Sequence, residues 1–178
     1  MNGQKKKKKG YDGAPTENLY GTDLSLDLAG TGYELFNDRE SLKSPFIEAD
    51  ILDENSPLVK DLSEQFSFIN AMSFFHLFKY ETQKIVAKRI VTLLRPQPGS
   101  VLVGRHVGHE IAGECDEETM LGYCHNEQSW KEFWDVIGKE TGTKWSVEAS
   151  QDSWGPLISK GFLKMEGRIK LKFKVRRE

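Results

Sequence analysis

Apolar residues follow two patterns along this chain, short continuous runs and helical stripes. The run "FSFINAMSFFHLF" at residues 66–78 has little alternation with polar residues, which is typical of a strand covered on both faces. The next segment, "YETQKIVAKRIVTLL", predicts an amphipathic helix that the prolines of "RPQPG" end. We expect the apolar face of this helix to hold Ile85, Val86, Ile90, Leu93 and Leu94.

The C-terminal half continues the alternation. "SVLVGRHVG" predicts a buried strand, and "TKWSVEA" predicts another. Between them, "NEQSWKEFWDVIGKETG" predicts a helix capped by Asn126 and ended by Gly138 or Gly142. Its apolar spacing indicates core packing rather than a ligand box for Trp130, Phe133, Trp134 and Ile137. The last segment, "GRIKLKFKVRR", alternates strictly and predicts a strand with one solvated face, its core side formed by Ile169, Leu171, Phe173 and Val175.

The N-terminal part follows the same order with a weaker pattern. "NLYGTDL" predicts a strand, "SLDLAGTGYELFNDRESL" a helix broken by a turn at Gly30 and Gly32, and "SPFIEADIL" a second strand ending at Asp50. Pro57 suits the first turn of a short helix, with Ser56 as its cap. Repeated strands and helices before an alternating last strand predict an α/β doubly wound fold with an antiparallel strand near its end.

The composition indicates which class of protein the chain belongs to. The 178 residues are 38% hydrophobic and 29% charged with a net charge of −2, which is typical of a globular domain and gives no general reason to expect a nucleic-acid partner. No apolar run approaches the roughly 18 residues of a membrane helix, so we expect a cytoplasmic protein without membrane association. Cys115 and Cys124 are expected to be free thiols, with a disulfide between them as the alternative, and their spacing is poor for a metal site.

The N-terminus carries five consecutive lysines in "MNGQKKKKKGYDG". Like charges repel one another, so we expect residues 1–13 to form a disordered basic tail. A nuclear-import signal and a phosphate-binding arm are the alternatives for this run. The folded domain is expected to span 14–178.

Ligands of doubly wound sheets bind beyond the carboxyl ends of the strands, so the candidate residues are those at predicted strand ends. They are Asp23, Asp50, Asn70 with Ser73, and Arg105 with His106. For Arg105 and His106 the alternative is that they belong to the polar loop expected from Gly108 to His125. The carboxylate of Asp23 can accept hydrogen bonds from two ribose hydroxyls, and capping of the following helix is the alternative role. Asp50 can accept the exocyclic amine of an adenine while Ile51 packs on the base; the alternative is an aspartate that forms a turn.

His76 lies in an aromatic stretch just past the buried strand expected within residues 66–78, and is a candidate general base or pocket residue. A lone histidine among aromatic residues is more often structural, and that alternative stays open. The sequence contains no G-x-G-x-x-G, no phosphate-binding loop, no serine–histidine–acid order and no metal signature.

Several blocks together resemble the fungal S-adenosylmethionine-dependent methyltransferases that modify secondary metabolites, notably meroterpenoids. They are "DGAPTENLYGTDL", "GYELFNDRESLKSPFIEADIL", "FSFINAMSFFHLF", "AKRIVTLLRPQPGSVLVGRHVG" and "SWKEFWDVIGKETGTKW". The resemblance implies a Rossmann-like class I methyltransferase sheet with helices on both faces and a reversed last strand. It also implies S-adenosyl-L-methionine as cofactor and His76 at the substrate mouth. The implied cofactor contacts are Asp23 on the ribose, Leu24, Asp50 with Ile51 around the adenine, and Asn70 with Ala71 beside the methionine.

The resemblance begins near Asp12, whereas the first strand, the glycine-rich turn and the first helix of such enzymes precede that point. We therefore expect a partial methyltransferase domain over 14–178 with weak or absent cofactor binding. The expected activity is methyl transfer to an oxygen of a small-molecule secondary metabolite. The alternative is an inactive methyltransferase-like fragment that acts only through protein interactions. The sequence leaves homo-oligomerisation open.

Overall fold

The computed structural model describes residues 15–115, 121–153 and 166–178. The basic tail predicted at 1–13 lies outside the described residues. The chain divides into two compact units, Met1–Asp61 and Leu62–Glu178, and each is described by itself. The single domain expected over 14–178 stays a prediction.

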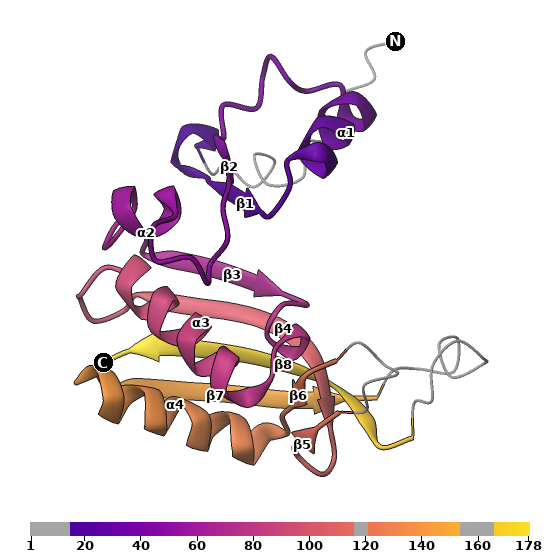
Figure 1. Cartoon of the computed structure of the whole chain (residues 1–178), viewed down its shortest axis with the longest axis vertical. Coiled ribbons are helices and arrows are strands. Elements are labelled where there is room, and N and C mark those ends of the chain that lie inside the picture. Colours follow the sequence, from indigo (N-terminus) through magenta and orange to yellow (C-terminus); the bar gives the residue numbers. More distant parts are fainter. Residues whose placement is uncertain (1–14, 116–120, 154–165) are drawn as a thin grey trace. The chain divides into compact units, whose positions relative to one another are not determined.

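In the N-terminal unit, a short parallel pair of strands lies beside one helix (Figure 1). The strands are β1 (Gly21–Asp23) and β2 (Phe46–Glu48), and Asp23 is in register with Glu48. The remaining elements are η2 (Thr16–Asn18), α1 (Asp27–Phe36) and α2 (Pro57–Asp61). The break predicted in α1 is wrong, because the helix runs through Gly30 and Gly32. It ends at Asn37, whose left-handed backbone (φ 48°) stops the ladder.

Aromatic contacts hold α1 to β2. The rings of Tyr33 and Phe46 meet edge-on with centroids 5.7 Å apart. The guanidinium of Arg39 lies 4.7 Å from the centroid of the Tyr33 ring. The side chain of Ser56 does not cap α2, contrary to the prediction, because its buried hydroxyl has no hydrogen-bond partner among the described residues. The Val59 and Lys60 N–H groups instead donate to the Ser56 carbonyl.

The C-terminal unit is built on a four-stranded sheet with the order β3-β4-β8-β7 (Figure 1). β3 (Phe68–Met72) and β4 (Val101–His109) are parallel, and β8 (Arg168–Arg177) is antiparallel to both β4 and β7 (Trp145–Asp152). The predicted antiparallel strand near the end of the chain is confirmed. The other elements are η3 (Phe75–Leu77), α3 (Tyr80–Leu93), β5 (Gly113–Glu114), β6 (Tyr123–Cys124) and α4 (Glu127–Thr141).

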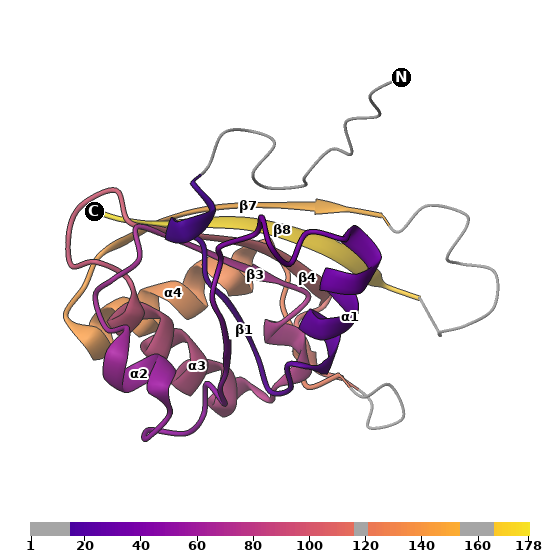
Figure 2. The same cartoon turned by 90° about the horizontal axis from the view of Figure 1, so that it is seen from above.

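α3 and α4 lie on the same face of this sheet (Figure 2). The core lies between these two helices and the sheet. The residues predicted for it from α4 and β8 are all buried: Trp130, Phe133, Trp134, Ile137, Ile169, Leu171, Phe173 and Val175. The apolar face predicted for α3 is confirmed except at Ile85, which is 46% exposed. Ile85 is one position out of phase with the stripe that contains Val86 and Ile90, so it lies at the side of that stripe and stays partly exposed.

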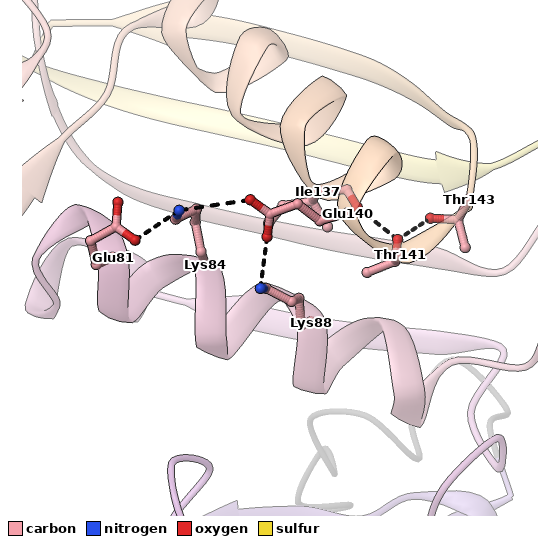
Figure 3. Close-up of polar contacts among 7 residues, drawn as sticks. All are labelled: Glu81, Lys84, Lys88, Ile137, Glu140, Thr141 and Thr143. Carbon is pink, nitrogen blue, oxygen red and sulfur yellow. Dashed lines mark hydrogen bonds and ion pairs between the residues drawn. The ribbon is translucent and has the colours of Figure 1, made fainter.

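Both ends of α4 form as the sequence predicts. The Asn126 side chain accepts from the Ser129 N–H (2.9 Å) and the Ser129 hydroxyl accepts from the Asn126 N–H (3.0 Å), which is a capping box. Gly142, with φ 66°, ends the helix. Figure 3 shows how the last turn of α4 meets α3, where Glu140 lies 2.7 Å from the Lys88 ammonium and 3.7 Å from that of Lys84.

Candidate functional site

Two carboxylates lie at one end of the N-terminal strand pair. Asp23 is the last residue of β1, and Asp50 follows the end of β2 by two residues. The strands are parallel and the Ala49 N–H donates to the Asp23 carbonyl (2.9 Å), so both aspartates lie at the carboxyl end of this sheet. Both side chains are exposed. The structure therefore brings together the two acids that the sequence singled out at strand ends.

The structure contradicts the alternative role of Asp23 and confirms that of Asp50. The helix-cap role of Asp23 is wrong, because α1 begins four residues later and the Ser25 hydroxyl accepts from the Asp27 N–H (3.2 Å). The turn-forming role of Asp50 is present, because its Oδ1 accepts from the Leu52 N–H (2.8 Å). The second carboxylate oxygen of Asp50 can still accept from a ligand.

The neighbours of the two aspartates give this edge an apolar component. Leu24, directly after Asp23, is 69% exposed. Ile51, directly after Asp50, is half-buried. An acceptor-rich edge with an apolar side chain beside each acid suits a ligand that has both hydroxyl groups and a flat base.

Asn70 and Ala71 belong to the C-terminal unit, on β3. Asn70 is exposed at the middle of the strand and Ala71 is buried in register with Gly104. The strand end expected at Asn70 with Ser73 is confirmed at Ser73, which directly follows the last paired residue Met72, while Asn70 itself lies two residues inside the strand. Arg105 and His106 also lie inside their strand, since β4 runs on to His109. The prediction that Arg105 and His106 end their strand is therefore wrong, because the sequence pattern of this run did not show where the strand stops.

His76 lies in η3, the short turn after β3, and is only 6% exposed. Its Nδ1 accepts from the Val107 N–H of β4 (3.3 Å), so the proton of the neutral ring is on Nε2. Burial, followed by the charge of Arg168, lowers the pKa of His76 to about 4. The imidazole is therefore neutral near pH 7, with Nε2–H as a donor.

Two further histidines lie behind His76 in the core. The ring centroids of His76 and His106 are 6.4 Å apart, and those of His106 and His125 are 6.1 Å apart. Burial is the main cause that lowers the pKa of His106 well below its ordinary value, and burial lowers that of His125 to about 3. Sequence reasoning missed His125 because it was assigned to a polar loop.

The same loop forms a hairpin, β5–β6, in which Cys115 and Cys124 are joined by a disulfide. The prediction of two free thiols is wrong. The Cys115 N–H donates to the Gly122 carbonyl (2.7 Å), and this pairing places the two Cα atoms 6.3 Å apart, within disulfide range. Loop residues carry no periodicity, so the sequence does not reveal the pairing.

Within the described residues, no three histidine, cysteine, aspartate or glutamate side chains converge as a metal site would require. The helices among those residues include none with the length and apolar character needed to cross a membrane. The predicted site residues form two sets, one at the end of the β1–β2 pair and one on β3 and η3, in separate units.

No family model matches the chain. Among curated proteins it is 47% identical over 151 residues to the O-methyltransferase phiE of Fungal sp. (strain ATCC 74256), covering 84% of this chain and 50% of that protein. It is 38% identical over 161 residues to the Asnovolin E/Chermesin D methyltransferase nvfJ of Aspergillus novofumigatus, covering 89% and 58%. The chain is a homologue of these fungal methyltransferases. It spans about half the length of the curated relatives it matches.

Comparison with solved structures identifies the fold of this methyltransferase homologue. The 1,6-didemethyltoxoflavin-N1-methyltransferase of Burkholderia thailandensis, solved with S-adenosylhomocysteine, matches 90% of the chain with a TM-score of 0.59 and 12% identity, and 61% of that protein is covered. The [4+2]-cyclase SpnF matches 88% with a TM-score of 0.61 and 16% identity, and 64% of it is covered. The fold is the Rossmann-like class I methyltransferase fold. Because one neighbour is a cyclase, the fold alone does not assign a reaction.

Proposed function

We propose that the chain is part of an S-adenosyl-L-methionine-dependent methyltransferase that acts on an oxygen of a small-molecule secondary metabolite. The similarity to fungal methyltransferases over more than four fifths of the chain is the observation that carries this proposal. The paired carboxylates at the carboxyl end of β1–β2 support it, because that edge is where sheets of this class bind nucleoside ligands.

The described residues fit the chemistry of this cofactor. In the proposal, the exposed carboxylate of Asp23 accepts from the ribose hydroxyls, with Leu24 beside it. Asp50 accepts the adenine amine through the oxygen that the Leu52 N–H does not occupy, and Ile51 packs on the base. Asn70 and Ala71 on β3 are assigned to the methionine end.

The cofactor supplies an activated methyl group on a sulfonium, so the protein has little acid–base work to do. The role of the chain's residues is to hold donor and acceptor in line, which contributes most of the rate gain in such transfers. The proposal places His76 on the substrate side as a hydrogen-bond donor. With Nδ1 occupied by the Val107 N–H and a pKa of about 4, its neutral ring offers Nε2–H rather than a base.

Titration calorimetry with S-adenosylhomocysteine tests the proposal. Because the sequence has no glycine-rich turn, we expect only weak binding, and we expect Asp23→Asn and Asp50→Asn each to weaken it further by about tenfold, the loss typical of one charge-assisted hydrogen bond. Asp53→Asn is the matched control, because Asp53 lies in the same turn and its Oδ1 accepts from the Asn55 N–H (2.8 Å) as that of Asp50 does from Leu52. Absence of binding heat, or equal losses in all three variants, would contradict the assignment.

A further inference from the structure

A buried polar network joins α3 to three other segments of the C-terminal unit. Gln83 of α3 is fully buried. Its Nε2 donates to the carbonyls of Phe78 (3.0 Å) and Tyr123 (2.8 Å). Its Oε1 lies 3.0 Å from Nε2 of His125. One glutamine side chain therefore connects the turn before α3, strand β6 and the residue before the cap of α4.

The partners of Gln83 fix the protonation of the network. Because the amide nitrogen donates twice, the amide oxygen is the acceptor and His125 Nε2 carries the proton. Nδ1 of His125 is then an acceptor, 2.9 Å from the Ser129 hydroxyl. Each buried group of Gln83 and His125 has a partner, so the network specifies one arrangement of the segments it joins.

The segment that this network holds is the turn containing His76. The Gly122 N–H donates to the His76 carbonyl (2.8 Å) and the Tyr123 N–H donates to the Phe78 carbonyl (2.9 Å). Gly122 approaches the Phe78 carbonyl so closely that a Cβ would overlap it. The Gln83 amide bridges these two segments, because it donates to one carbonyl of each.

We propose that Gln83 is a positioning residue for the substrate side of the site, which acts by holding the η3 turn, and with it His76, against β6. The functional part of this assignment rests on the proposed methyltransferase function. The helical pattern gives no sign of the role, because a polar residue in an amphipathic helix is expected at the surface.

Gln83→Met tests the role, since methionine has a similar length and volume and lacks the two donors. The reporters are the amides of Val107, Gly122 and Tyr123, which donate to His76 or Phe78. We expect their hydrogen exchange to accelerate about tenfold or more, the effect of losing one buried hydrogen bond. Gln128→Met is the matched control, because Gln128 is exposed on α4 and bonds only to Glu132 among the contacts described (2.8 Å).

The titration of His76, followed by NMR, tests whether Gln83 acts on this ring in particular, because a general loss of stability would not shift the titration midpoint of the folded protein. The charged and titratable groups that act on the ring are Arg168 of β8 and His106 of β4. If the turn loosens and admits water, the midpoint should rise from about 4 toward 6.5 by about one pH unit or more. The Leu171 amide in the buried strand β8 reports opening of the whole unit, and we expect its exchange to stay within about threefold.

The outcomes separate the two proposals. Reporters that move in Gln83→Met no more than in Gln128→Met, or only together with Leu171, would overturn the positioning role. S-adenosylhomocysteine binding by the unaltered chain tests the methyltransferase function by itself. A chain that binds no S-adenosylhomocysteine while the reporters move would support the hold on the turn and overturn its link to methyl transfer. If Gln83→Met does not fold, Gln83→Asn, whose shorter amide cannot reach both carbonyls, is measured with the same reporters.

Discussion

At the scale of single residues, two glycines of the β5–β6 hairpin give a matched prediction. A Cβ at Gly122 would overlap the Phe78 carbonyl and approach the Lys79 nitrogen to 2.5 Å, whereas a Cβ at Gly113 would meet nothing within 4 Å. Gly122→Ala should therefore lower the free energy of unfolding in urea by about 1–3 kcal/mol, the usual cost of overpacking. Gly113→Ala should change it by less than about 0.5 kcal/mol. Equal effects of the two substitutions would show that the hairpin does not press on the η3 turn.

Residue types at strand ends were readable from the sequence, and buried polar partners were not. Asp23 and Asp50 were found because each follows a short apolar segment that forms a parallel strand, and ligands bind at the carboxyl ends of such strands; the same reasoning failed for Arg105 and His106, where the strand continues. Gln83 and His125 were missed because each carries its role through contacts about 40 positions away in the sequence. The cofactor roles of Asp23, Leu24, Asp50, Ile51, Asn70 and Ala71, and the substrate-side role of His76, stay predictions.

At the scale of elements, the N-terminus of α4 gives a prediction about capping. Asn126→Ala removes the acceptor of the Ser129 N–H, so unfolding in urea should show a loss of about 0.5–2 kcal/mol. Asn126→Asp keeps that acceptor and places a negative charge at the helix N-terminus, but loses the bond from Asn126 Nδ2 to the Glu110 carbonyl (3.0 Å). We expect it to lie within about 0.5 kcal/mol of the unaltered chain. An aspartate variant as unstable as the alanine variant would mean that the Glu110 bond, and not the cap, matters.

Elements with strong periodicity were predicted correctly. α3, α4 and β8 each show a clear period, α3 and α4 also show terminating residues, and the structure confirms all three elements. The hairpin β5–β6 and its disulfide were not predicted, because strands of two residues are too short to show a period. α1 was predicted to break because glycine is a poor helix former, yet the helix is continuous through both glycines.

At the scale of the whole C-terminal unit, three buried histidines, on η3, on β4 and before α4, predict a loss of stability at acid pH. The pKa of His76 is lowered to about 4 and that of His125 to about 3, and that of His106 is also lowered, mainly by burial. Each histidine regains its ordinary pKa near 6.5 on unfolding, so the unfolded chain binds more protons below that pH. Their contribution to stability is therefore complete above pH 6.5 and is lost as the pH falls through 6.5 toward 4 and 3.

Urea unfolding at pH values from 7.5 to 5 should show this loss before most carboxylates titrate. Each histidine that takes up a proton on unfolding adds about 1.4 kcal/mol per pH unit to the slope of stability against pH. His76→Asn removes one of the three and should flatten the slope between pH 6 and 5 by about that amount, whatever its effect at pH 7.5. Glu140 and Asp152, whose pKa values the ammonium groups of Lys88 and Lys172 lower, add their own acid sensitivity only at lower pH. A slope that is unchanged in His76→Asn would mean that the folded protein admits the proton, and hence that the His76 turn opens to water far below pH 6.5 without unfolding the sheet.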